Sequence, residues 1–152
     1  MFAMTAAHKT VPLGTLIRVR SAKGGRSIIV RVNDRGPYYR DRILDLSYGA
    51  ADRLGIDGVG MVSIEAVSDK RGRLLDRSSR LYVRLGMDAP APGDVDRSLG
   101  RLIRTGMYEA MTLLRKGMDC LALGPYESFT DAQAALVRIG TIFPEASICS
   151  SF

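Results

Sequence analysis

The chain is poor in cysteine and histidine. Cys120 and Cys149 are its only cysteines, and His8 is its only histidine. Two cysteines without paired spacing exclude the usual Cys and His zinc sites, and we expect no metal and no cofactor. The two thiols are compatible with a disulfide only if the protein is exported and the strands that carry them are adjacent.

Long apolar segments are also missing. No run approaches the roughly 20 apolar residues that a membrane-spanning helix needs, so we expect no transmembrane segment. The N-terminus lacks the charged start, the apolar centre and the small-residue cleavage site of a signal peptide. As written, the chain would stay in the cytoplasm.

The composition is that of an ordinary soluble globular protein, with 46% hydrophobic and 25% charged residues. A formal charge of +6, from 22 basic and 16 acidic residues, is a modest excess. The basic residues are interleaved with apolar strand positions, and no nucleic-acid motif is present. We therefore expect no nucleic-acid partner, and another anionic polymer explains the charge equally well.

One strand and the turn after it organise the chain. Residues 27–32 alternate in a β-branched pattern with period two, which predicts a strand with one face toward a core. Residues 33–37, Asn-Asp-Arg-Gly-Pro, then end it. Asp34 should lie where the buried strand opens onto solvent. It either carries chemistry there or merely caps the turn.

Four motifs follow one another along the first half. They are Thr-Ala-Ala-His-Lys-Thr at 5–10, Leu-Gly-Thr at 13–15, Val-Arg-Val-Asn-Asp-Arg-Gly-Pro-Tyr at 30–38 and Arg-Ile-Leu-Asp-Leu-Ser at 42–47. In this order and spacing they closely resemble the rare lipoprotein A family over roughly residues 1–67. The resemblance implies a six-stranded double-psi β-barrel and a lytic transglycosylase that cleaves the glycan strands of peptidoglycan.

The resemblance also implies the site residues. The family's histidine falls on His8 and its active-site aspartate on Asp34. Asp34 would act as acid and then as base, because in lytic transglycosylation the sugar's own 6-hydroxyl attacks and no water is activated. His8 would orient or tune that carboxyl. The residues expected to line the sugar cleft are Thr5, Asn33, Arg35 and Tyr38, the last by stacking on a sugar face.

The chain departs from the family pattern at its start. The family carries a catalytic Glu and a further Asp before the Thr-Ala-Ala-His motif, and those positions would precede Met1. Either the chain begins at an internal Met of a longer protein, or it has lost its principal acid. We therefore expect weak cleavage or none. The rival functions are a glycan-binding module and expansin-like loosening of the polymer.

Strand and helix signals divide the chain into two halves. We expect strands at 15–20, 27–32, 43–46 and 62–67, and a helix at 47–55 with Ser47 as its N-cap and Gly55 as its stop. A glycine pair at 24–25 predicts a hairpin between the first two strands. The polar stretch at 68–80 marks the boundary, so the predicted domains are 1–68 and 81–152, with a linker at 69–80.

The second half predicts a ferredoxin-like βαββαβ domain. Its expected strands are 81–86, 110–115, 119–123 and 146–149, and its expected helices are 94–105, with an apolar stripe at Val95, Leu99, Leu102 and Ile103, and 130–139, capped by Thr130. The segment at 123–129, the Ala-rich helix and the Phe-Pro-Glu-Ala at 143–146 resemble the sporulation-related repeat (SPOR) domain, which implies binding of peptide-free glycan. An unrelated module that holds a partner is the alternative.

Further expectations concern the thiols, the partners and the compartment. The usual strand order of the ferredoxin-like fold, 4-1-3-2, separates Cys120 from Cys149 by one strand, so both should stay unpaired. The expected partner is the peptidoglycan glycan strand, and the chain should be a monomer. The resemblance places the protein in the periplasm or at the outer membrane if the full-length protein carries an export signal.

Overall fold

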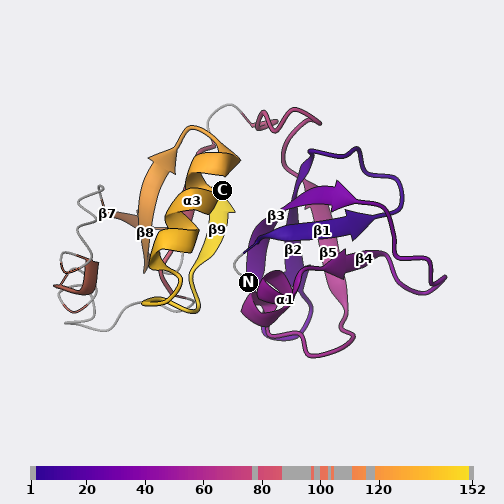
Figure 1. Ribbon diagram of the computed structural model, residues 1–152, viewed down its shortest axis with the longest axis horizontal. Coiled ribbons are helices and arrows are strands. Elements are labelled where there is room, and N and C mark those ends of the chain that lie inside the picture. Colours follow the sequence, from indigo (N-terminus) through magenta and orange to yellow (C-terminus); the bar gives the residue numbers. More distant parts are fainter. Residues whose placement is uncertain are drawn as a thin grey trace.

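The computed structural model describes residues 3–76, 79–86, 97, 100–102, 104, 111–115 and 119–150, with only the backbone described at 111–115 and 119–121. Two sheets lie side by side, one from each half of the chain (Figure 1). Within the described residues, no helix has both the length and the apolar character needed to cross a membrane.

The first half folds into a curled sheet of five strands. In chain order the elements are β1 (Thr5–His8), β2 (Leu16–Ser21), β3 (Ser27–Asp34), β4 (Leu44–Leu46), α1 (Tyr48–Leu54) and β5 (Val62–Ala66). The spatial order is β4-β1-β3-β2-β5, with β1 and β3 parallel and the other pairs antiparallel. Six strands were expected; the part of the chain that the structure describes contributes five, and β4 and β5 are the edges of the sheet.

Strand β1 was not predicted. Its Thr-Ala-Ala-His sequence has no β-branched run, and alanine is a weak strand former. It becomes a strand because its backbone pairs with β3 on one side and β4 on the other. Tertiary pairing has overridden local propensity here, and this pairing positions His8.

Helix α1 has the predicted ends. The Ser47 side chain accepts a hydrogen bond from the backbone N–H of Ala50 at 3.4 Å. Gly55 ends the helix at φ 68°, in the left-handed region that glycine adopts without steric cost. The Ser47 hydroxyl also donates to the carbonyl of Ala3, so the cap ties α1 to the chain just before β1.

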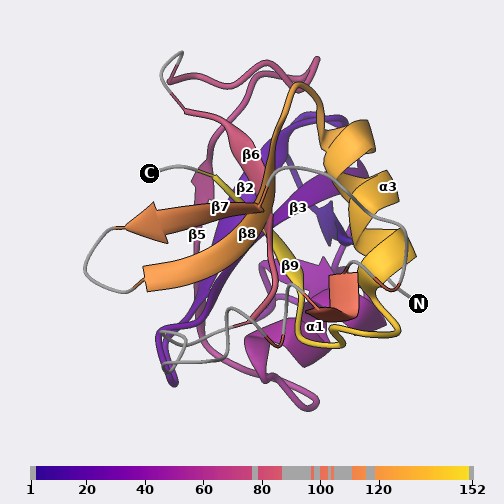
Figure 2. The same cartoon turned by 90° about the vertical axis from the view of Figure 1, so that its left-hand side faces the viewer.

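The second half contains a four-stranded antiparallel sheet. Its elements are β6 (Leu81–Arg84), β7 (Met111–Arg115), β8 (Asp119–Tyr126), α3 (Phe129–Ile139) and β9 (Ser147–Ser150). The order β7-β8-β6-β9 is the predicted 4-1-3-2 order. Helix α3 runs beside this sheet (Figure 2). The predicted helix at 94–105 is helical at 97, 100–102 and 104; its ends, and Val95, Leu99 and Ile103, lie outside the described residues.

Several boundaries in the second half differ from prediction, among them the end of β8 and the start of α3. β8 continues past Leu123 through Gly124 and Pro125, because the pairing of β6 with β8 shifts register there and a bulge tolerates proline. Helix α3 is capped by Ser128 and not by Thr130; the Ser128 hydroxyl accepts from the N–H of Asp131 at 3.1 Å. The first turn of the helix therefore begins earlier than the alanine pattern indicated.

The two halves share one hydrophobic core. Ile29 and Val30 are adjacent on β3 and are only 1% and 0% exposed, so both faces of this strand are covered. One face was expected to meet solvent; β9 and α3 of the second half cover it instead. The guanidinium of Arg31 stacks over the ring of Phe129 at 4.6 Å, and Nε of the buried Arg53 donates to the carbonyl of Ala146.

The predicted linker folds against the first sheet. The Ser68 hydroxyl accepts from the N–H of Leu16 at 2.7 Å, and residues 68 and 74 form an isolated β-bridge. Asp69 closes the intervening turn, because its Oδ1 accepts from the N–H groups of Arg71 and Arg73 at 2.8 and 3.0 Å. These two bonds, and the charges of the same arginines, hold the pKa of Asp69 below its usual value. Residues 69–74 are therefore an ordered turn.

Candidate active site

Parallel pairing of β1 and β3 places the two predicted catalytic residues at the same end of the first sheet. Ala7, the residue before His8, pairs with Asp34 at the end of β3. A register shift between Ala6 and Ala7 gives β3 one extra residue, so Asp34 and not Asn33 lies opposite Ala7. Motifs more than twenty residues apart in the sequence thus meet at one end of the sheet.

His8 is oriented by the backbone that follows it. Its Nδ1 accepts hydrogen bonds from the N–H groups of Thr10 at 3.1 Å and Val11 at 3.0 Å. Partial burial, and then the positive charges of Arg35 and Lys9, lower the pKa of His8 below 6.5. The ring is therefore neutral at pH 7, with its proton on Nε2.

Asp34 is the last residue of β3, which continues two residues past the predicted strand, and the turn follows it. Its Oδ1 accepts from the N–H of Arg35 at 2.7 Å, so the capping role is real, and the side chain is exposed. Among the described residues no hydrogen bond or ion pair joins His8 to Asp34, so the expected orienting contact is not made. The second carboxyl oxygen of Asp34 faces no protein partner in the described part of the chain.

Arg35 links the turn after β3 to the segment that follows β1. Its NH1 donates to the carbonyls of His8 at 3.2 Å and Val11 at 2.6 Å. The Lys9 ammonium makes a similar tie to the carbonyl of Tyr39 at 2.9 Å. Arg35 thus fixes the end of β1 beside the Asp34 turn.

The expected cleft residues do not all gather at this end. Tyr38 follows the turn and is 89% exposed, which leaves its ring available for stacking. Asn33 is exposed beside Asp34. Thr5 lies at the opposite end of β1, where it pairs with Arg31, so the structure separates it from His8 and Asp34.

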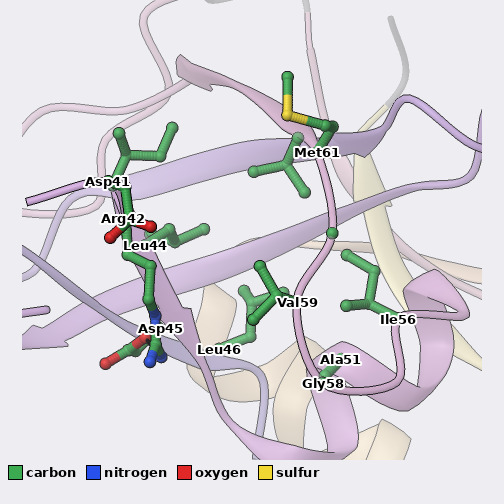
Figure 3. A pocket seen from close by; sticks show the side chains of 13 residues that line it. Asp41, Arg42, Leu44, Asp45, Leu46, Ala51, Ile56, Gly58, Val59 and Met61 are labelled. Carbon is green, nitrogen blue, oxygen red and sulfur yellow. Dashed lines mark hydrogen bonds and ion pairs between the residues drawn. The ribbon is translucent and has the colours of Figure 1, made fainter. Parts of the chain in front are cut away.

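A hollow of about 770 Å³ lies between the two edges of the first sheet (Figure 3). β4 and the loop before it form one wall, and the loop from Ile56 into β5 forms the other. Its apolar side chains include Leu46, Val59 and Met61, and the ion pair of Arg42 with Asp45 lies at its rim. None of the predicted site residues lines it.

An arginine-rich groove of about 530 Å³ lies where the two halves meet. Arg31 of β3, Arg71 and Arg73 of the folded linker and the turn before α3 line it. On β1, Thr5 pairs with Arg31 and Ala7 pairs with Asp34. Thr5 and Ala7 are two residues apart and so point to the same face of the sheet, and their partners do too. The groove, which Arg31 lines, therefore lies on the same face as Asp34. Neither this groove nor the hollow was predicted, because each joins segments whose proximity depends on the tertiary fold.

The chain matches known proteins in two comparisons. Residues 1–66 match the family described as lytic transglycolase. The chain is 51% identical over 134 residues to the endolytic peptidoglycan transglycosylase RlpA of Neisseria meningitidis serogroup A, covering 84% of this chain and 56% of the relative. It is 41% identical over 136 residues to RlpA of Pasteurella multocida, covering 88% and 40%.

A shorter match involves RlpA of Pseudomonas aeruginosa, which is 51% identical over 69 residues, or 44% of this chain and 20% of the relative. The chain therefore spans from a fifth to little more than half of the length of these relatives. Two of the matches are too long to end with the first sheet, so similarity continues into the second half. Residues 1–66 thus match the lytic transglycolase family, and most of the chain is similar to RlpA proteins.

Proposed function

We propose that the chain is an endolytic lytic transglycosylase that cuts peptide-free glycan strands of peptidoglycan and leaves 1,6-anhydro ends. The observation that carries this proposal is the β1–β3 register, which pairs Ala7, the neighbour of His8, with Asp34 at one end of the curled sheet, within a segment that matches the lytic transglycolase family. The names of the matched relatives, endolytic peptidoglycan transglycosylases, support the same reaction.

Asp34 supplies the acid in this proposal. Its carboxyl protonates the oxygen of the leaving sugar while the 6-hydroxyl of the retained sugar attacks the anomeric carbon. His8 is neutral and held by backbone N–H groups, so it lines the site without adding charge. Tyr38 and Asn33 contact the sugars, and Arg35 keeps the two segments in place.

The proposal extends to the architecture and the compartment. We assign residues 1–68 to a domain of double-psi barrel type and residues 81–152 to a SPOR-like, ferredoxin-like domain that holds peptide-free glycan. The strand order β7-β8-β6-β9 with α3 beside it supports the second assignment. A peptidoglycan substrate requires a periplasmic or outer-membrane location, and the arginine-rich groove suits the carboxylates of stripped muramic acid residues.

Cleavage is tested directly with purified, peptide-free glycan strands. Mass spectrometry should detect 1,6-anhydromuramyl ends in the presence of the chain. Asp34→Asn should lower their rate of formation by about 10²- to 10⁴-fold, the usual contribution of a general acid. The matched control is Asp57→Asn, an exposed aspartate in the loop after α1. If the chain binds glycan but never cleaves it, the enzymatic function is rejected and the glycan-binding function is retained.

A further inference from the structure

Three neighbouring strands place two carboxyl groups on one face of the first sheet. Ala7 of β1 pairs with Asp34 of β3 on one side and with Asp45 of β4 on the other. Residues paired across adjacent strands direct their side chains to the same face. Asp34 and Asp45 therefore flank Ala7 on this face, and the turn after Asp34 passes close to the Ala7 methyl group, since a Cβ added at Gly36 would lie 3.8 Å from it.

The separation of these carboxyls suits a glycosidic bond. Adjacent strands lie about 4.8 Å apart, so two spacings place the two Cα atoms roughly 9 to 10 Å apart. Each side chain extends further and can lean over Ala7. Pairs of carboxyls that act on opposite sides of a glycosidic bond are about 5 to 9.5 Å apart.

The two carboxyls have different surroundings. Asp45 forms an ion pair with Arg42, and both side chains are 38% exposed, so substrate can reach them. Asp34 accepts a backbone N–H, and in the described part of the chain no cation is ion-paired with it. Arg42 thus compensates a negative charge on Asp45, whereas Asp34 lacks such a partner. The two carboxyls therefore differ in the charged side chain beside them.

We propose that Asp45 is the second catalytic carboxyl of the site and acts as the base. Asp34 gives its proton to the oxygen of the leaving sugar as the bond from that oxygen to the anomeric carbon breaks. The 6-hydroxyl oxygen bonds to the same carbon, and its proton passes to the Asp45 carboxylate. Proton exchange with water then restores both groups. Arg42 is a positioning residue that holds Asp45 beside Ala7.

This assignment rests on the proposed cleavage and is tested with Asp45→Asn and Asp45→Ala in the full chain. Peptide-free glycan is the substrate, and 1,6-anhydromuramyl ends are counted by mass spectrometry. Both variants should slow cleavage by about 10²- to 10⁴-fold. Added formate should restore part of the Asp45→Ala rate, because a small carboxylate can occupy the vacated position. A merely structural role for Asp45 would give no such rescue.

Asp41→Asn is the matched control, since Asp41 is exposed in the same wall of the hollow but lies outside the three-strand row. It should cleave at the rate of the unmodified chain. Thermal unfolding of each variant identifies any loss of fold, and Arg42→Lys, which keeps the charge, should retain more activity than Arg42→Ala.

The outcomes separate the two proposals. If the unmodified chain forms no anhydro product, the proposed cleavage is rejected, and the base role of Asp45 is rejected with it. Product from the unmodified chain with an undiminished rate in folded Asp45→Asn would overturn the role of Asp45 alone. An Asp45→Ala variant that folds normally, cleaves slowly and shows no rise in rate with formate would also overturn it. Loss in both Asp45 variants, rescue by formate and a normal Asp41→Asn rate support it.

Discussion

Gly14 offers a direct test of how firmly the folded linker packs against the first sheet. It lies in the turn before β2 at φ 94°, and its N–H donates to the carbonyl of Val32 at 2.8 Å. A Cβ added at this position would lie 2.3 Å from the backbone carbonyl oxygen of Lys70. That oxygen belongs to the turn closed by Asp69, so it cannot withdraw as a flexible side chain would.

The cost of Gly14→Ala has two parts. Left-handed backbone in a residue with a Cβ costs about 1 to 2 kcal/mol. Forcing an extra carbon into a filled space costs about 1 to 3 kcal/mol more. We therefore expect Gly14→Ala to lose about 2 to 5 kcal/mol of unfolding free energy, which for a chain of this size lowers Tm by roughly 4 to 20 °C.

Gly24→Ala separates the two parts. Gly24 has a similar φ of 85° in the β2–β3 hairpin, and a Cβ there would meet nothing within 4 Å. It should lose only the backbone part, about 1 to 2 kcal/mol. Urea unfolding of both variants measures the difference. Equal losses would refute the reasoning, because they would mean that Lys70 does not pack on Gly14.

The remaining predictions concern titration, packing and covalent state. Since His8 is the only histidine, its NMR titration is unambiguous, and its midpoint should fall below 6.5. Above pH 6.5 the ring is neutral in both the folded and the unfolded chain, so its contribution to stability is complete there. That contribution is lost as the pH falls from 6.5 through the folded pKa. A measured midpoint above 6.5 would contradict the lowered pKa of His8. Leu136→Ala, at a side chain that is 0% exposed, should cost about 2 to 5 kcal/mol in urea unfolding, whereas the exposed Val137→Ala should cost under 1. Thiol titration of the unreduced, denatured chain should find both Cys120 and Cys149 reactive, because β6 lies between the strands that carry them; a mass two daltons low would reject this.

Local sequence signals identified most elements but not their contacts. The Ser47 and Gly55 signals located α1 because helix ends are satisfied by neighbouring residues. The glycine pair at 24–25 likewise predicted the hairpin of β2 and β3. β1 was missed because its only support is its pairing with β3 and β4, which no local pattern records.

The site shows the same division. The family motifs predicted His8 and Asp34 as site residues, and β1–β3 pairing places both at one end of the first sheet. Motif spacing could not show that His8 bonds to the backbone after it, nor that Thr5 lies at the far end of the strand. Motif spacing alone assigns no role to Asp45, because its position beside Ala7 depends on the register of β4 against β1.

The open side of the first sheet bears on how the chain behaves at high concentration. β4 and β5 each have one neighbour among the described strands, and an unpaired strand edge can recruit a strand from another molecule. β4 is three residues long and carries a charge at its centre, which opposes such addition. β5 is longer and follows Met61, which is 80% exposed. Edge-to-edge association should therefore begin along β5, and Met61→Lys is the substitution that should keep concentrated solutions monomeric.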